Sequence, residues 1–429
     1  MVDGSPLIPT IAIRSKKGSP KWVFGREAAN LKPDGKMEVF QNWKSDLFRP
    51  RNDRESAAAI IVAEHFFGWL KNKIESADIK LSETNTRVAM PAFDKSDEIA
   101  LVVARCMELN DWESPLILRA TEPHANTVGL FSKGQNVVSC LTDGRVNLNY
   151  GAMFGPQNIF VQTARSYVLQ LNNRRRITAV VIDIGAFTTD LAELVFDVTA
   201  PGTDIGDGLQ SVRQQSYTVG VINELDGLVF KTLAARHKLD WTRLSFREAE
   251  LMKHALYQGS PYNLLIEPRG QVRLGDAEDR ALISQHIEQF AKMILEKVAE
   301  FIERHLPAIF YLTGGGGLIP GVAGYLHNSL SRRGVGSGQI PDVGPPSVGG
   351  GRWRGWQDTG EGLHRIATAL GGASVILEAS ADTRQQRIIA DEERPFGGVR
   401  RSEKVVECRC RAGNKDCCFC GGTGYYLRG

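Results

Sequence analysis

The chain has 429 residues, of which 42% are hydrophobic and 24% charged, and its formal net charge is +3. This composition is typical of a globular protein of two or three domains, and so small a charge predicts no electrostatic partner by itself. No apolar run approaches the ~18 residues that a membrane helix needs, and the N-terminus lacks the features of a signal peptide. We therefore expect a cytoplasmic protein without a membrane partner.

Strands and helices alternate along the chain, which predicts an α/β fold. Residues 8–29 predict two short strands and a helix, and residues 55–75 a longer helix. Next come a strand over 87–93 and a helix with Ser96 as its N-cap. A further strand then enters a loop at Glu122-Pro123, and another helix follows that loop. Further elements are a hairpin around Asp143-Gly144, a surface loop over 333–357 and a last helix over 362–377.

One long amphipathic helix is expected over residues 281–306. Its apolar residues keep to one face at helical spacing: Ile283, Ile287, Phe290, Ile294, Val298 and Phe301.

The stretch VVIDIGAFTTDLAEL, residues 180–194, places small polar residues directly after an apolar strand. Gly185 lets backbone N–H groups approach an anion, and Thr188 and Thr189 add hydroxyl groups. Asp183, at the strand end, can hold a metal-bound water, and Asp190 flanks the turn on its other side. The alternative interpretation is a polar turn that closes a three-stranded meander.

A run of four glycines stands between a predicted strand and a predicted helix: Gly314, Gly315, Gly316 and Gly317. Bare backbone at these four positions can contact a flat ring, and the helix N-terminus behind them favours negative charge. The alternative interpretation is a flexible linker.

A third segment suits the nucleoside part of a nucleotide. Glu250, Lys253 and His254 project from one helical face. The carboxylate suits ribose hydroxyls, and the two nitrogen-bearing side chains suit an adenine edge or a phosphate. A solvated charged helix face is the alternative.

These three segments, in this order and spacing, resemble the actin-like ATPase superfamily, most closely the nucleotide-binding domain of the seventy-kilodalton heat-shock chaperones. DIGAFTTD is similar to their second phosphate loop, LTGGGGLIPG to their adenosine loop, and E-x-x-K-H to the helix that clasps the adenosine. VAMPAFDKSDEIALVVARCMELN and LILRATEPHAN resemble a strand–helix–strand unit with a Glu-Pro turn. Further segments of the same family are matched by FGREAA, VFQNWKSDLF and ATALGGASVI. The resemblance therefore spans about residues 8–378.

The resemblance implies a two-lobed fold that holds ATP or ADP with Mg²⁺ between the lobes. Its parts would be lobe I (1–175, with an insertion at 131–175), lobe II (176–358), a crossover helix (359–380), a linker (381–404) and a small zinc module (405–429).

The resemblance also implies a role for each residue of the phosphate site. Asp183 would bind a metal water and order the attacking water, with Glu122 at the opposite wall. Thr188 would contact the γ-phosphate, and Asp190 would support the loop. Lys44 would neutralise charge on the transferred group.

The sequence departs from this family in two places. The family's first hairpin, whose Asp-x-Gly-Thr loop grips the β- and γ-phosphates, has no counterpart in the expected position, and LTDGRVN at 141–147 is out of order. Three explanations stay open: binding without efficient turnover, substitute groups from 131–175, or a chain that begins late. Nothing after residue 380 resembles the chaperones' peptide-holding β-sandwich.

Five of the seven cysteines lie in the last 22 residues. Four thiolates at short paired spacings are typical of a zinc site. A module this small cannot form its own hydrophobic core and needs a bound metal to stabilise its fold. The cluster resembles half of the zinc repeats of J-domain co-chaperones, and the proposed ligands are Cys408, Cys410, Cys417 and Cys420, with Cys418 as the spare. A disulfide or a disordered tail is the alternative.

Basic residues surround the clustered cysteines. Such residues could bind nucleic acid, although a solvated basic face is the more common interpretation. These residues are Arg394, Arg400, Arg401, Lys404, Arg409 and Arg411.

The leading hypothesis from the sequence is an ATP-binding switch whose lobe closure acts on a protein partner, with ATP hydrolysis undecided. A second hypothesis is a nucleotide-binding scaffold with weak or no turnover. A third is a filament-forming actin-like protein, which the long insertions disfavour.

Overall fold

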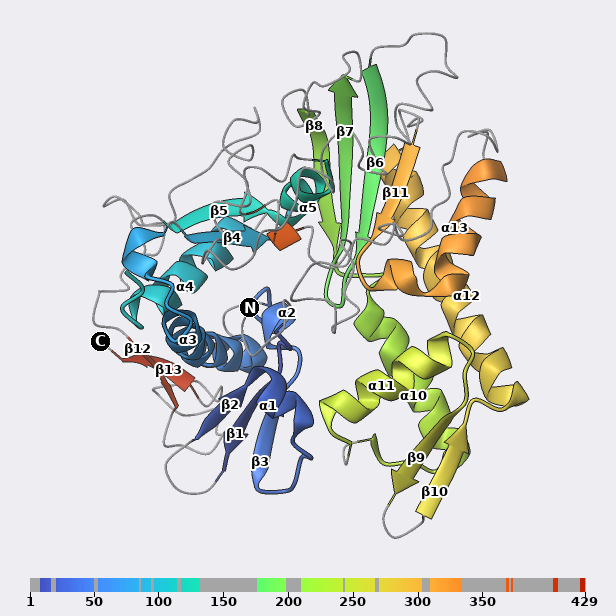
Figure 1. The fold of residues 1–429 in the computed structure, drawn as a ribbon, viewed down its shortest axis with the longest axis horizontal. Coiled ribbons are helices and arrows are strands. Elements are labelled where there is room, and N and C mark those ends of the chain that lie inside the picture. The colour runs from blue at the N-terminus through green and yellow to red at the C-terminus, as the bar shows by residue number, and fades with distance from the viewer. Residues whose placement is uncertain are drawn as a thin grey trace.

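The computed structural model describes residues 8–16, 21–49, 53–84, 86–93, 96–113, 117–131, 176–197, 210–241, 244–266, 270–302, 309–332, 368–369, 372, 404–407 and 425–428. The hairpin expected around Asp143-Gly144, the loop at 333–357, most of the crossover helix, nearly all of the linker and the clustered cysteines lie outside these residues. The described part mixes helices and strands in an α/β arrangement (Figure 1).

Residues 8–131, called here the first region, contain one antiparallel sheet and one parallel strand pair. The elements are β1 (Ala12–Ser15), β2 (Trp22–Phe24), α1 (Gly25–Asn30), β3 (Met37–Phe40), α2 (Trp43–Asp46), α3 (Arg54–Glu75), η1 (Leu81–Glu83), β4 (Thr86–Met90), α4 (Ser96–Glu108), β5 (Ile117–Thr121) and α5 (Glu122–Phe131). The antiparallel sheet has the order β2-β1-β3, and α4 joins β4 to β5 as the crossover that a parallel pair requires.

The long helix α3 connects these two parts. The Asp53 carboxylate caps it by accepting a hydrogen bond from the Glu55 N–H at 2.8 Å, which satisfies one otherwise unpaired donor. Its buried residues Val62 and Phe66 join the same hydrophobic cluster as Phe24 of β2 and residues of α4.

Residues 176–332, called here the second region, have their own core around a four-stranded sheet of order β11-β6-β7-β8. The elements are β6 (Arg176–Ile184), β7 (Thr189–Asp197), β8 (Gln210–Tyr217), α10 (Ile222–His237), α11 (Phe246–Tyr257), β9 (Tyr262–Ile266), β10 (Gly270–Leu274), α12 (Ala277–Ile302), β11 (Ile309–Thr313), η3 (Gly316–Leu318) and α13 (Pro320–Arg332). β6, β7 and β8 form an antiparallel meander, and β11 pairs with β6 in parallel.

The two faces of this sheet differ. Ile182, Leu191 and Leu312 belong to the apolar core, which they share with Phe290 and Ile294 of α12. The helix α5 of the first region packs against β6, β7 and β8, and Figure 1 shows it beside these strands, between them and β5.

Most elements match the sequence-based predictions. The long helix runs over 277–302 rather than 281–306, and all six of the apolar residues assigned to one face are buried. The predicted loop at Glu122-Pro123 is wrong, because α5 begins at Glu122 itself. Proline is tolerated in the first turn of a helix and a carboxylate is favourable there, so the Glu-Pro pair starts the helix.

Two strands near the C-terminus pack against α3. β12 (Lys404–Glu407) and β13 (Tyr425–Arg428) form an antiparallel pair, and both contact α3, as Figure 1 shows. The pair brackets the segment that carries the clustered cysteines. Within the described residues, no helix is long and apolar enough to cross a membrane.

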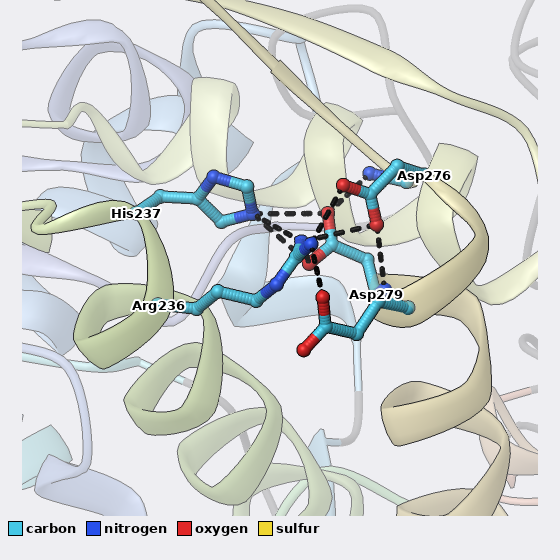
Figure 2. Close-up of polar contacts among 6 residues, drawn as sticks. Arg236, His237, Asp276 and Asp279 are labelled. Atoms are coloured by element: carbon cyan, nitrogen blue, oxygen red, sulfur yellow. Dashed lines mark hydrogen bonds and ion pairs between the residues drawn. The ribbon is translucent and has the colours of Figure 1, made fainter.

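An ion cluster around the buried Asp279 fixes the C-terminus of α10 to the N-terminus of α12 (Figure 2). Asp279 is fully buried and bonds both the Arg236 guanidinium and His237 Nε2, the latter at 2.9 Å. Arg236 also bonds Asp276 at 2.8 Å and Glu278 at 2.7 Å. A buried charge is stable only when it is paired, so this cluster holds α10 and α12 together.

Replacing Asp279 with alanine should therefore lower the free energy of unfolding by about 1–3 kcal/mol, because His237 and the buried Gly275 N–H lose their carboxylate partner while Arg236 keeps Asp276 and Glu278. Glu278→Ala is the matched control, since Glu278 contacts the same arginine but its side chain is 69% exposed; its cost should stay below about 1 kcal/mol. Urea unfolding measures both, and equal losses would contradict this account.

Candidate functional site

Four polar residues form a row across the second region's sheet, near the ends of its strands. Asp183 pairs with Thr313 of β11 on one side and with Asp190 of β7 on the other, and Asp190 pairs with Ser216 of β8. Residues directly opposite one another in a sheet point to the same face, so these four side chains, the polar row, lie together. Like charges in opposite positions destabilise a sheet, and the two aspartates therefore need other partners.

Hydroxyl groups bind the buried carboxylate of Asp190. Thr188 Oγ1 donates to Asp190 Oδ2 at 2.9 Å, and the Ser216 hydroxyl donates to the other oxygen. The Ala92 N–H, which follows β4 in the first region, in turn donates to Ser216 Oγ at 2.7 Å. The first region thus contacts the polar row through its backbone as well as through α5.

Asp183 is bound by groups from two other elements. Asn126 of α5 donates from Nδ2 to Asp183 Oδ2 at 2.7 Å, and the Thr313 hydroxyl also bonds this carboxylate. Asp183 is only partly buried, whereas Asn126 and Thr313 are almost wholly buried.

The loop between β6 and β7 is a tight turn. The Gly185 N–H donates to the Thr188 carbonyl at 2.8 Å, and a Cβ on Gly185 would lie 2.9 Å from that oxygen. The structure gives Thr189 a local partner: its buried hydroxyl donates to the Gly220 carbonyl at 2.7 Å. Of the two predicted threonines, Thr188 is the one whose hydroxyl reaches the carboxylates.

Two charged residues of the first region, Glu122 and Lys44, belong to the surroundings of this site. Glu122 begins α5, and burial raises its pKa, while the Lys44 ammonium and the Thr188 hydroxyl act to lower it. Lys44 lies on the short helix α2 and is exposed. The structure therefore brings Glu122 and Thr188 together with the aspartates and places Lys44 near Glu122, although these residues come from distant parts of the sequence.

The carboxylates outnumber the nearby cation. Burial and the neighbouring Glu122 raise the pKa of Asp183 to about 7. Burial together with Glu122 and Asp183 holds the pKa of Asp190 well above its usual range. Raised carboxyl pKa values indicate that negative charge here is not fully compensated, so a bound cation would stabilise the ionised site.

Side chains alone do not complete a metal site here. Among the described residues, no three His, Cys, Asp or Glu side chains are arranged to hold a metal ion. Mg²⁺ keeps several waters and commonly takes its other ligands from phosphate groups.

The glycine loop packs tightly against the end of β6. Gly314 has a φ of +77°, and a Cβ there would lie 2.2 Å from Asp183 Oδ1; a Cβ on Gly316 would lie 2.2 Å from Ile184 Cγ2. Such distances exclude any side chain unless the neighbours move. The run is therefore a packed segment rather than a flexible linker, and it brings bare backbone to Asp183.

The four glycines are not equivalent, which corrects the expectation that all of them present bare backbone. Gly314, Gly316 and Gly317 are buried, and Gly315 alone is partly exposed. Gly315 has an ordinary helical φ of −64° as the residue before η3. A Cβ on Gly315 would meet only Ile222 Cδ1, at 3.1 Å. Packing thus requires glycine at positions 314 and 316, whereas Gly315 is the position in the run that a ligand can reach.

The predicted face of α11 forms a second cluster. Lys253 Nζ lies 2.5 Å from Glu250 Oε1 and 3.2 Å from Asp226 Oδ2, and Tyr257 donates to Asp226 at 2.6 Å. Although burial acts to raise it, His254 and Lys253 lower the pKa of Glu250 to about 2. Glu250 is thus kept ionised, and Lys253 already has two carboxylate partners.

The two regions also meet at α11. Lys32 Nζ lies 3.2 Å from Glu248 Oε1, and Phe246 packs against the small apolar cluster of β1 and α1. A cavity of about 540 Å³ lies beside α2, lined mainly by residues of the first region and by Trp241 and Leu244 of the second. Its volume is within the range of small-molecule sites.

Sequence reasoning missed three residues of this site: Asn126, Thr313 and Ser216. Asn126 lies four residues after Glu122, so the helical repeat places both on one face of α5. Thr313 immediately precedes Gly314. The helical spacing of Asn126 and the position of Thr313 beside the glycine run could both be read from the sequence. Neither shows that these two side chains contact each other or Asp183.

Neither the models of known protein families nor the curated proteins match this chain. The site is therefore interpreted from its own geometry.

The raised pKa of Asp183 predicts that stability falls as pH rises from about 4 to about 7. In that window the folded state holds a proton that the unfolded aspartate, with a pKa near 3.8, has lost, so each rise in pH favours unfolding by up to about 1.4 kcal/mol per unit. Urea midpoints at pH 5, 6, 7 and 8 measure the slope. Asp183→Asn should make it less negative, whereas an unchanged slope would show that Asp183 titrates normally.

Gly314→Ala should destabilise the protein more than Gly259→Ala. Both glycines have positive φ, but nothing lies within 4 Å of a Cβ on Gly259, so that substitution carries only the backbone strain of about 1–2 kcal/mol. At Gly314 the clash with Asp183 adds a further ~1–3 kcal/mol. Thermal unfolding compares the stability of the two variants directly. Equal losses of stability would mean that the glycine loop moves to accommodate the new side chain.

Proposed function

We propose that this chain is an ATP-binding molecular switch of the actin-like, heat-shock type, with the first and second regions as its two lobes. The observation that carries the proposal is the meeting of Glu122 of one region, on which Lys44 acts, with Asp183 and Asp190 of the other. A paired set of acidic groups with one lysine, next to a packed glycine loop, suits the phosphates and Mg²⁺ of a nucleotide. In this proposal, closure of the lobes acts on a protein partner.

Each residue has a role that follows from its position. Lys44 supplies positive charge where phosphate charge develops, and Thr188 offers its hydroxyl to the terminal phosphate. Asp183 and Glu122 bind waters, including those of a hydrated Mg²⁺. When bound, MgATP would supply the phosphoryl group and the cation that neutralises these carboxylates.

The nucleoside end is assigned to the second region. The backbone of the glycine run, chiefly at Gly315, would contact the base, and Glu250 on α11 would accept hydrogen bonds from the ribose hydroxyls. Lys253 would hold Glu250 in place through their ion pair, while His254, which is the more exposed of the two basic residues, would contact the adenine edge or a phosphate.

A catalytically weak nucleotide scaffold is the second candidate. The feature that favours it is the Asp-x-Gly-Thr hairpin that the sequence lacks in the expected position. Without that hairpin, half of the family's phosphate clamp is absent, and binding is expected to survive better than turnover.

The C-terminal segment is proposed to be a zinc module held by Cys408, Cys410, Cys417 and Cys420. Its support is the β12–β13 pair, whose two strands stand on either side of these cysteines in the sequence and pack against α3. The basic residues of this segment make nucleic acid a further candidate partner.

The test is a single-turnover assay with excess protein, γ-labelled ATP and Mg²⁺. Wild-type protein should retain the label and release phosphate, and Asp183→Asn should slow release by about 100-fold, as loss of one charge-stabilising group typically does. Glu83→Gln, which changes an exposed carboxylate that pairs with Lys80, is the control.

Each outcome has one meaning. Label retained intact by the wild type would favour the scaffold over the ATPase. Phosphate release that Asp183→Asn does not slow would remove Asp183 from the reaction, and a wild type that retains no label would reject nucleotide binding.

A further inference from the structure

Asn126 is a buried amide at the junction of three separate segments. Its side chain, on α5, is only 1% exposed. Nδ2 donates to Asp183 Oδ2 at 2.7 Å and to Thr368 Oγ1 at 3.2 Å, while Oδ1 accepts from Thr313 Oγ1 at 3.4 Å. One side chain thus joins the first region to β6, to β11 and to the segment at 368–369.

We propose that Asn126 is a positioning residue that fixes the Asp183 carboxylate and makes its orientation depend on the position of α5. The proposal rests on the proposed function, because it assigns Asp183 a role toward a hydrated cation. It adds a residue that neither the motifs nor the assigned roles include.

The chemistry of this position requires an amide of this length. Both N–H donors are used, and the carbonyl oxygen shares the single Thr313 hydroxyl proton with Asp183; among side chains only asparagine and glutamine carry this set of groups. An aspartate would place another carboxylate beside Asp183, and an aliphatic side chain would leave the polar partners unsatisfied in a buried position.

The contacts also define how Asp183 can meet a cation. Asn126 binds one carboxylate oxygen, and the other faces the backbone of Gly314, where even a Cβ would not fit. Because Glu122 lies one helical turn away on the same α5, any shift of this helix changes Glu122 and the Asp183 orientation together.

The link between Asn126 and Asp183 is tested first without nucleotide, by a double-mutant cycle in urea. Asn126→Ala should lower the unfolding midpoint in the wild-type background and should lower it less in the Asp183→Ala background, because the contact that the two residues share has then already been lost. Strictly additive losses would overturn the link. If Asn126→Ala does not fold, Asn126→Ser takes its place in the cycle.

The functional consequence is tested by comparing the affinity for ATP with Mg²⁺ to the affinity in EDTA. Asn126→Ala should reduce the affinity ratio about 10- to 100-fold, the value of a hydrogen bond to a charged group, with little change in EDTA. Thr127→Val is the matched control, because Thr127 is buried on the same helix and bonds only locally, to the Pro123 carbonyl at 2.8 Å. It should lower the melting temperature and leave the ratio unchanged.

The outcomes separate this inference from the proposed function. A wild type that binds no ATP rejects the function, while the urea cycle still decides whether Asn126 fixes Asp183. A ratio that falls equally in Asn126→Ala and Thr127→Val would show that Asn126 acts only through stability and would overturn its positioning role.

Discussion

The arrangement of this protein depends on two aspartates placed opposite each other on neighbouring strands. The β6–β7 register puts Asp183 beside Asp190 on one face of the sheet, and Glu122 adds a third carboxylate from across the region boundary. Such a set is unfavourable by itself. The hydroxyls of Thr188, Ser216 and Thr313, the Asn126 amide and the nearby Lys44 compensate it in part, and a cation–phosphate ligand is the partner that we propose to complete it.

The same constraint explains why the first region packs where it does. The helix α5 lies on the sheet face that carries the polar row, so its polar residues Glu122 and Asn126 meet carboxylates rather than apolar side chains. On the opposite face, Ile182 and Phe310 join the core with α12. The sheet therefore has an apolar core on one face and a cluster of charged and polar groups on the other. In that cluster, residues from motifs far apart in the sequence lie together.

How much was predictable depended on the range of the interaction. Helical periodicity located α12 and its buried face, and the strand–glycine–helix pattern located β11 and α13, because these signals are local. Pro123 was misinterpreted as a loop residue, since its tolerance in a first helical turn depends on context. The four glycines look alike in the sequence, and only their packing distinguishes the partly exposed Gly315 from its buried neighbours. The Asn126–Thr313 contact joins residues 187 positions apart, and only the packing of α5 on the sheet reveals it.

A crystal structure of the chain with Mg²⁺ and a non-hydrolysable ATP analogue tests the central claim most directly. The account predicts the phosphates between Lys44 and Thr188, the base against the glycine run at Gly315, and a cation whose waters bridge to Asp183. An analogue bound elsewhere, or a saturated crystal with no analogue beside the polar row, would contradict the claim that these carboxylates form a nucleotide site.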